Sequence, residues 1–465
     1  MDHRPRTLAE PDWTKEPSLY SIVKINLTSR WNNRSLNPCG VELMGLDAPQ
    51  RTKRLTQGAA ATQLAGADAP GCGPLRGARQ QGTLSLRQQI YEQVRSAGRI
   101  SRAVLAKELE VSPGSVTPLV SDLLAADLLR ELEDETQHVG RGRPPVTLGV
   151  NPERGLVAGL KISDHEYSAI LVDLAGQPVA QATLPRAADV RSIKSLLDEL
   201  SVLYARLLDS AGPDAPPVLG VGLGLPGMVE HASGLLRWSP ILDARNVDLA
   251  RAVSDRLGLP VSVDNDASLL TMAELWFGKG RSLSDFAVVT IEYGVGLGLV
   301  VDHAPYRGAH GFGMELGHTK VQLDGALCRC GQRGCLEAYV ADFALVREAP
   351  IALDGALPPR GEVLEALYNQ AKDGNEAARA IFDRAGRYLA LGLANVANLF
   401  DPRRIILSGS RMRYDYLYAE EMLAEVSGLT LNTPPPIEVN AWDDLVWARG
   451  AAALALSDLT PRLMG

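Results

Sequence analysis

The sequence lacks a net positive charge, an apolar N-terminal segment and any long uninterrupted apolar run. Its formal net charge is −8, so attraction to nucleic acid or to an anionic membrane would need a local basic patch. The N-terminus, MDHRPRTLAEPDW, has no signal segment, and the most apolar run, FAVVTIEYGVGLGLVV, is rich in glycine and interrupted by Glu292. We therefore expect a cytoplasmic protein with no membrane partner, in which this run forms buried strands.

Cysteine is scarce, with five residues in a chain of 465. The odd number and the missing export signal argue against a disulfide framework. Three of the cysteines nevertheless fall within eight positions, at Cys328, Cys330 and Cys335. Thiolates grouped in this way suit metal binding in a reducing compartment.

The composition is that of a globular protein, with 46% hydrophobic and 22% charged residues and room for two or three domains. Residues 1–83 depart from it, because they are rich in Gly, Ala, Pro, Asn and Arg and show weak apolar periodicity. They contain eleven Lys/Arg and seven Asp/Glu. We expect a disordered or non-domain extension there, with a basic arm that touches DNA as the alternative.

Residues 84–150 have the pattern of three short helices followed by a β-hairpin. Leu86, Ile90 and Val94 recur every four residues and mark one helical face. Ser101 and Ser112 are placed to cap the next two helices. The inward-facing residues expected on these two helices are Val104, Leu105 and Leu109, then Val116, Leu119, Val120, Leu123 and Leu124. This pattern predicts a winged helix-turn-helix domain that binds DNA.

The DNA contacts expected from this domain lie on the third helix and at the hairpin tip. The module has eight Lys/Arg and nine Asp/Glu, so it is not basic overall. Its tip sequence, VGRGRPP, carries two arginines that could enter a minor groove, although a solvated turn is the alternative. The predicted DNA-binding residues are Ser112, Ser115, Thr117, Ser121, Arg141 and Arg143.

Pro118 is unusual because it falls inside the predicted third helix. It removes the bond to the Gly114 carbonyl and is expected to kink the helix. The kink either tilts the helix N-terminus in the major groove or marks a DNA-binding site that has degraded.

From residue 151 to 465 buried strands alternate with helices, which predicts an α/β domain. Three stretches within it, VDNDASLLTMAELWFGKG, GMELGHTKV and CRCGQRGCLEAYV, closely resemble the ROK family of sugar kinases and sugar-responsive repressors. The resemblance implies an actin-like (ribonuclease H-like) two-lobed fold with the sugar between the lobes. Regulators of this family, such as xylose and N-acetylglucosamine repressors, add an N-terminal winged helix.

Chemistry and resemblance together predict a structural zinc site. Cys328, Cys330 and Cys335 supply three thiolates, and Gly331 and Gly334 permit the tight turns between them. The family pattern implies His318 as the fourth ligand. Four protein ligands leave no position for water, so we expect the zinc to hold the loop and not to catalyse.

The family's sugar-contacting positions correspond here to Asn265, Asp266, Glu315, His318 and Glu337. In the kinases Asp266 would be the general base, and His318 could ligate zinc through one nitrogen and a sugar hydroxyl through the other. One family stretch, SPNLGW, is replaced by SPILDA, in which Ile241 stands for an asparagine that helps to hold sugar. The identity of the sugar, and even sugar binding, is therefore left open.

The phosphate-binding stretches of the kinases are altered. In KISDH, Lys161 replaces an aspartate, and Asp164 and His165 replace the Gly and Thr of the phosphate loop; in EYGVGLG, Glu292 and Tyr293 replace a Gly-Thr pair. Two like charges 4 Å apart repel by about 4 kcal/mol at an effective dielectric constant of about 20, which would abolish ordinary ATP affinity. We expect a protein that is not an enzyme.

The leading hypothesis is a sugar-responsive repressor, in the form of a homodimer or homotetramer that releases operator DNA. A sugar kinase with an appended DNA-binding module is the alternative from another class. A third hypothesis keeps DNA binding and replaces the sugar by a protein inducer, which the loss of SPNLGW would allow.

Overall fold

The computed structural model describes residues 71–77, 84–132, 146–163, 165–187, 191–353, 357–359, 361–409, 412 and 420–465. The chain divides by its contacts into residues 1–61 and 62–465, and all described residues belong to the second unit. Among these residues, no helix is both long enough and apolar enough to cross a bilayer.

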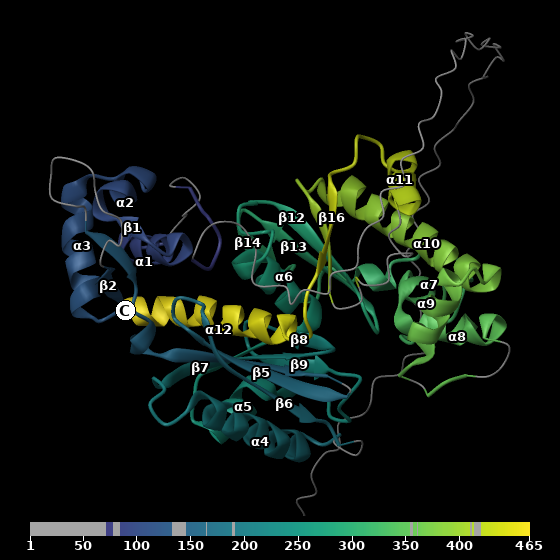
Figure 1. The fold of residues 1–465 in the computed structure, drawn as a ribbon, viewed down its shortest axis with the longest axis horizontal. Helices are drawn as coiled ribbons and strands as arrows, with labels where there is room; N and C mark the ends of the chain where they lie inside the picture. Colours follow the sequence, from purple (N-terminus) through teal and green to yellow (C-terminus); the bar gives the residue numbers. More distant parts are fainter. Residues whose placement is uncertain are drawn as a thin grey trace, which may run out of the picture. The chain divides into compact units, whose positions relative to one another are not determined.

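The first part of this unit contains three helices and a small antiparallel sheet (Figure 1). The helices are α1 (Leu86–Ala97), α2 (Arg102–Glu108) and α3 (Pro113–Ala125), and the strands β1 (Ile100–Ser101), β2 (Leu129–Leu132) and β3 (Thr147–Val150) pair in the order β1-β3-β2. Ser101 and Ser112 cap α2 and α3 as predicted, each by accepting a hydrogen bond from the amide three residues later.

The predicted inward faces are confirmed with one exception. Leu105, Val116 and Val120 are fully buried, but Val104 is 44% exposed. Since α2 has only seven residues, Leu105 and Leu109, spaced four apart, fill its inward face, and Val104 lies about 100° away around the helix. The prediction for Val104 was therefore wrong.

Packed structure also begins earlier than the expected start near Leu84. Residues 71–77 are seated against the rest of the unit, and Cys72 is only 1% exposed.

The first lobe of the α/β part is a five-stranded sheet with the order β11-β7-β4-β5-β6. Its strands are β4 (Leu156–Ile162), β5 (Glu166–Asp173), β6 (Pro178–Pro185), β7 (Val218–Leu225) and β11 (Val261–Asn265). Helices α4 (Ile193–Ala211) and α5 (Leu249–Leu257) accompany it, and β8 (Met228–Glu230), β9 (Leu235–Trp238) and β10 (Val247–Asp248) form a small sheet beside it.

The second lobe is a five-stranded sheet with the order β14-β13-β12-β15-β16. Its strands are β12 (Phe286–Ile291), β13 (Val295–Val301), β14 (Ala304–Tyr306), β15 (Ile405–Gly409) and β16 (Ile437–Ala441). The helices of this lobe are α7 (Glu337–Val340), α8 (Asp342–Ala352), α9 (Val363–Lys372), α10 (Glu376–Phe400) and α11 (Glu420–Leu429). The two similar sheets account for the two-lobed architecture that the sequence predicts.

Two helices, α6 (Asp266–Phe277) and α12 (Val446–Met464), pack against each other and connect the lobes (Figure 1). Glycine allows α12 to lie directly on the first sheet, because a Cβ at Gly222 would stand 1.8 Å from the Ala451 carbonyl oxygen. The C-terminal half of α6 is joined to the second lobe by Glu274, which is fully buried. Its Oε1 accepts hydrogen bonds from Ser408 Oγ (2.6 Å), Trp442 Nε1 (2.7 Å) and Asn440 Nδ2 (2.8 Å).

Candidate functional site

The four predicted metal ligands converge in the loop that follows the short 3₁₀ helix Leu316–His318. One ligand atom from each of His318, Cys328, Cys330 and Cys335 lies within 4.8 Å of all the others. Isolated antiparallel bridges fold the loop back on itself, and Gly331 (φ 85°) and Gly334 (φ 75°) make its turns. The left-handed conformation at both positions explains why the motif needs glycine there.

The spacing of these atoms fits a tetrahedral metal. Cys330 Sγ is 3.7 Å from Cys335 Sγ, and Cys328 Sγ is 3.8 Å from His318 Nδ1. A tetrahedron with metal–sulfur bonds of about 2.3 Å has edges of about 3.8 Å. Burial raises the pKa of the Cys328 thiol to about 12, so a cation is needed to make it a thiolate at neutral pH.

Two carboxylates flank this cluster. Glu337, at the start of α7, accepts a hydrogen bond from the Val295 amide (3.3 Å) and lies 3.7 Å from Cys328 Sγ through its other oxygen. Desolvation raises the pKa of Glu315, the charge of Glu337 raises it further, and His318 opposes both effects. Glu315, His318 and Glu337 therefore share one electrostatic environment. Because Nδ1 of His318 faces Cys328, Nε2 lies on the opposite side of the ring.

Asn265 and Asp266 lie where β11 ends and α6 begins. The Asn265 side chain caps α6 by accepting from the Ser268 amide (2.8 Å), so one of its polar atoms already has a structural role. The first turn of α6 touches β13, since a Cβ at Gly296 would lie 2.8 Å from the Ala267 Cβ. Gly296 follows Val295, whose amide binds Glu337, so the structure brings the five predicted sugar residues to one region.

The side chain of Asp266 forms an ion pair with Lys161 on β4. Lys161 is only 7% exposed, so its ammonium group is held close to this carboxylate. The sequence identifies Lys161 as a departure from the kinase pattern but offers no sign that it would pair with Asp266, 105 residues away.

A second ion pair behind Asn265 was not predicted. Arg307 donates two hydrogen bonds to Asp264 Oδ2, from Nε at 3.0 Å and Nη2 at 2.8 Å. Oδ1 of Asp264 accepts from the Asn265 amide at 2.9 Å, and His231 Nδ1 lies 3.7 Å from Oδ2. Asp264 belongs to the first lobe and Arg307 follows β14 of the second, so this pair joins the lobes. In the sequence, the only sign of this pair is Asp264, a polar residue at the end of an apolar strand.

In the altered SPILDA stretch, Ile241 is buried. This side chain is 4% exposed and belongs to the hydrophobic core of the first lobe, while Arg186 donates to its carbonyl oxygen (2.8 Å). Asp243 is at the surface, 3.9 Å from Arg191. Ile241 therefore offers no polar side-chain group to a sugar.

The β12–β13 turn carries an acid and an aromatic ring where the kinases have Gly-Thr. A Cβ at Gly409 would lie 2.6 Å from Glu292 Oε1, so this carboxylate lies against the end of β15. The Tyr293 ring is 47% exposed and stacks on the Arg329 guanidinium at 3.8 Å, whose other neighbour is the Phe343 ring at 4.4 Å. The turn therefore presents a carboxylate and a stacked ring instead of open backbone amides.

Of the predicted DNA-binding residues, those on α3 are exposed. Ser112 caps the helix and lies 2.9 Å from the Ser115 hydroxyl. Thr117 and Ser121 donate to the carbonyl oxygens of Pro113 and Thr117, at 2.9 and 3.0 Å. Pro118 lies inside α3, which continues through it to Ala125. Arg141 and Arg143 lie outside the described residues.

Comparison with known proteins agrees with this fold and site. The chain is 28% identical over 375 residues to a putative xylose repressor of a Caldicellulosiruptor species, an alignment covering 77% of this chain and 92% of that protein. A crystal structure of a ROK family transcriptional regulator, a homologue of E. coli Mlc, matches with a TM-score of 0.70 and 24% identity over 81% of this chain and 96% of the other, which supports the fold.

A ROK glucokinase from Streptomyces griseus, solved with glucose and AMPPNP, matches with a TM-score of 0.55 and 26% identity over 65% of this chain and 99% of that one. The model of the ROK family matches residues 157–458 of this chain. That match spans more than half of the sequence, and the chain belongs to the ROK family.

Proposed function

We propose that this protein is a sugar-responsive transcriptional regulator, acting as a repressor, and not a kinase. The observation that carries the proposal is the ion pair between Lys161 and Asp266. A general base must be free to accept the proton of the attacked hydroxyl, whereas the Asp266 carboxylate is already engaged by the Lys161 ammonium group. The carboxylate of Glu292 near Gly409 adds repulsion toward a polyphosphate.

Zinc is proposed at His318, Cys328, Cys330 and Cys335, where the donor set and spacing suit it. It would supply structural cross-linking alone, because four protein ligands complete its coordination. The loop so fixed carries His318 and leads directly into Glu337 on α7. Thiolate ligands also suit a reducing compartment, and we place the protein in the cytoplasm.

The effector is proposed to bind at Asn265, Asp266, Glu315, His318 and Glu337. Carboxylates accept hydrogen bonds from neighbouring sugar hydroxyls, and charge-assisted bonds of this kind are the stronger ones. Because the Lys161–Asp266 pair remains polar and partly accessible, Asp266 is assigned to orienting a hydroxyl and not to activating it.

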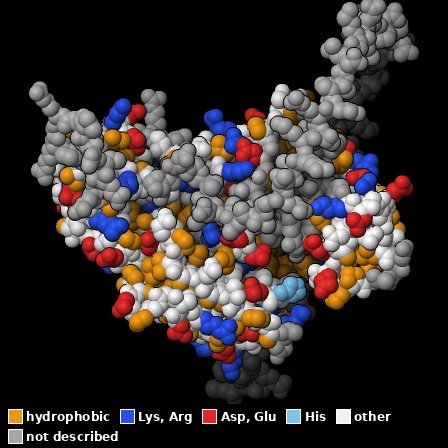
Figure 2. All heavy atoms as spheres, in the orientation of Figure 1, with side chains coloured by type: hydrophobic (Ala, Val, Ile, Leu, Met, Phe, Trp, Pro, Cys, Tyr) orange, Lys and Arg blue, Asp and Glu red, His pale blue; other side chains and the backbone are white. Residues whose placement is uncertain are grey.

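Residues 84–150 are proposed to be a winged helix-turn-helix domain that binds operator DNA. Its helices and sheet have the required order, and the hydroxyls on the exposed face of α3 retain lone pairs that can accept from bases. On the face drawn in Figure 2, acidic and basic side chains are interspersed over the described residues. DNA affinity would therefore come from local contacts, among which we place Arg141 and Arg143. A homodimer or homotetramer would read inverted half-sites.

A protein inducer in place of a sugar is the second candidate, and the burial of Ile241 favours it. In that case the acids around the metal loop would be remnants of the ancestral site.

Three measurements on the purified full-length chain test the proposal. Thermal unfolding with a panel of monosaccharides should show a rise in melting temperature for at least one sugar. Selection from random duplexes should yield an inverted-repeat operator. ADP production with ATP and the same sugars should stay at background, and turnover would establish the kinase alternative. Operator binding without any sugar response would favour a protein inducer.

A further inference from the structure

The seven residues Gly71–Gly77 form a strap between residues 84–150, here called the helical module, and the two-lobed domain. We propose that this strap, together with Arg95, fastens the helical module to the C-terminal end of α6, so that α6 carries the state of the effector site to the module. The role of α6 in carrying the effector state rests on the proposed function, whereas the fastening by the strap can be tested separately.

On the side of the helical module, the strap is bound to α1. The Cys72 amide donates to the Arg95 carbonyl oxygen (3.1 Å), and Arg76 Nη1 pairs with Glu92 at 2.8 Å. A Cβ at Gly71 would lie 2.2 Å from that same Arg95 oxygen, so the strap backbone approaches α1 as closely as glycine permits.

On the side of the two-lobed domain, the strap is bound to the end of α6 and the loop after it. The Gly73 amide donates to the Trp276 carbonyl oxygen (2.9 Å), and the Leu75 amide donates to that of Arg281 (2.8 Å). Arg281 Nε returns a bond to the Gly73 oxygen (3.0 Å), and Arg76 Nη2 reaches the His303 oxygen (3.2 Å). The strap is therefore hydrogen-bonded on both sides through its backbone.

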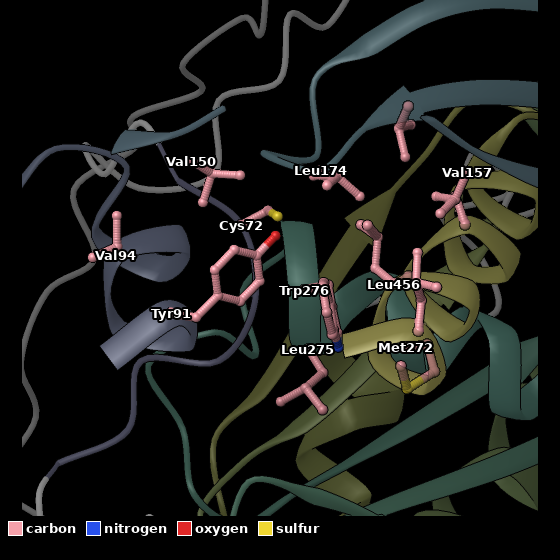
Figure 3. Close-up of a cluster of buried hydrophobic side chains, with 14 of the residues drawn as sticks. Cys72, Tyr91, Val94, Val150, Val157, Leu174, Met272, Leu275, Trp276 and Leu456 are labelled. Carbon is pink, nitrogen blue, oxygen red and sulfur yellow. The ribbon is translucent and has the colours of Figure 1, made fainter. Parts of the chain in front are cut away.

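The Cys72 side chain is enclosed among residues from several parts of the chain (Figure 3). Its neighbours in this cluster include Tyr91 of α1, Leu174, Trp276 and Leu456. A Cβ at Gly176 would stand 2.4 Å from Cys72 Sγ. Gly176 is thus the position at which the first lobe makes room for the strap.

Arg95 makes the second connection. Its guanidinium lies 4.5 Å from the Trp276 ring and 5.5 Å from that of Tyr91, and Nη1 donates to Thr460 Oγ1 at 2.8 Å. Arg95 is 3% exposed, so this cation–π contact is desolvated and at the stronger end of its range. It joins α1 to both α6 and α12.

The interface contains further contacts and a cavity. The cavity, of about 400 Å³, is lined by Gly71 and Arg95 as well as by Arg130, Gly149, Asp173 and Gln177. Arg281 Nη2 donates to the Ser96 carbonyl oxygen (2.7 Å), and Arg87 of α1 donates to the Met464 carbonyl oxygen of α12. The strap and Arg95 are the part of this interface that meets the end of α6.

Helix α6 begins at Asp266 and ends at Phe277, so its 12 residues span about 18 Å. Its first turn lies at the proposed effector site and its last turn at the strap. A continuous helix transmits a displacement of one end to the other, whereas a loop would absorb it. The Glu274 network joins the same helix to β15 and β16, so closure of the lobes would move the strap contacts as well.

The fastening is tested with Gly176→Ala in the full-length chain, because the added methyl group would displace Cys72. Gly212→Ala is the matched control: its φ of 85° equals the 84° of Gly176 within a degree, yet nothing lies within 4 Å of its Cβ position. Alkylation by iodoacetamide at pH 8, resolved by residue with mass spectrometry, reports exposure, since burial raises the pKa of Cys72 to about 11. Cys335, a proposed zinc ligand, serves as the internal control that the metal loop is unchanged.

We expect alkylation of Cys72 to be at least about tenfold faster in Gly176→Ala, with Cys335 unchanged and Gly212→Ala like the native chain. Arg76→Gln, which removes the bonds to Glu92 and His303, should do the same, with Arg256→Gln on α5 as its control. If Cys72 stays as protected as in the native chain in both Gly176→Ala and Arg76→Gln, the strap is not a fastening and the inference is wrong.

The consequence is tested by operator affinity with and without the most stabilising monosaccharide of the panel. Gly176→Ala should still bind the sugar and the operator. In this variant, however, the sugar should change the operator affinity by less than about twofold. If a variant with exposed Cys72 shows the same sugar-induced change in operator affinity as the native chain, the proposed role of α6 is wrong. Absence of sugar and operator binding in the native chain would instead contradict the proposed function, and the alkylation result would still decide the fastening.

Discussion

Lys161 and Asp266 form an ion pair across the junction between the first sheet and α6. By the family resemblance of the sequence, Lys161 corresponds to an aspartate of the kinases' phosphate loop and Asp266 to their general base. The lysine at position 161 thus reverses the charge expected there and also pairs with the carboxylate of Asp266. The pair also ties β4 to the first turn of α6, which lies at the proposed effector site.

Breaking this pair should lower stability without creating a kinase. Lys161→Met leaves a carboxylate whose side chain is 34% exposed, so we expect a loss of about 2 kcal/mol in the free energy of unfolding, between the values for surface and buried pairs. Urea denaturation of Lys161→Met, Asp266→Asn and the double variant measures the coupling, expected at about 1–2 kcal/mol. Additive effects would show that the two charges do not interact, and ADP production should remain at background throughout.

Removal of one thiolate should remove the metal. Cys328→Ser is expected to reduce zinc from about one ion per chain to near zero, because three remaining donors leave an open site. The melting temperature should fall to that of the chelator-treated native chain. Cys39→Ser, outside the four-ligand set, serves as the control and should keep its metal. A native chain purified without zinc and unaffected by chelators would contradict this prediction.

Glu337→Gln should weaken sugar binding more than it weakens the fold. The amide keeps an acceptor for the Val295 amide but loses the charge, and a hydrogen bond to a charged group contributes about 1.5–3 kcal/mol. The sugar affinity measured by calorimetric titration should fall by about 10- to 100-fold. Glu376→Gln, at the exposed start of α10, is the control, and an equal loss there would rule out a specific contact.

Breaking the pair between Arg307 and Asp264 should lower the free energy of unfolding more than breaking the Lys161–Asp266 pair does. The Asp264 side chain is only 4% exposed, so Arg307→Met leaves a buried uncompensated charge and should reduce the free energy of unfolding by about 3–5 kcal/mol. Adding Asp264→Asn should restore part of that stability. Guanidinium denaturation measures both variants, and a double variant that is less stable than Arg307→Met would contradict the explanation.

Pro118→Arg tests the two interpretations of the proline in α3. If the proline sets the tilt of the helix in the major groove, the variant should bind the selected operator more weakly and with less preference over random duplex in a gel-shift assay. Tighter binding that stays specific would show that the proline weakens DNA recognition instead.

Much of the fold follows from local patterns in the sequence. The face marked by Leu86, Ile90 and Val94 lies on α1, and Ser101 and Ser112 cap the helices they precede. These features depend on residues within a turn or two of each other. Val104 was misplaced because the short helix α2 has a narrow inward face, whose position depends on what packs against it.

The sequence by itself determined the family, the two-lobed architecture and the four side chains that meet in the candidate metal loop, because each rests on short spacings that the chain carries along its length. Only the tertiary structure decided that Lys161 pairs with Asp266, that Arg307 pairs with Asp264 and that Gly71–Gly77 fastens the helical module. These partners lie 105, 43 and up to 227 residues apart. Contacts over such separations arise when packed sheets and helices bring buried charges and backbone groups within reach, and those groups then require partners.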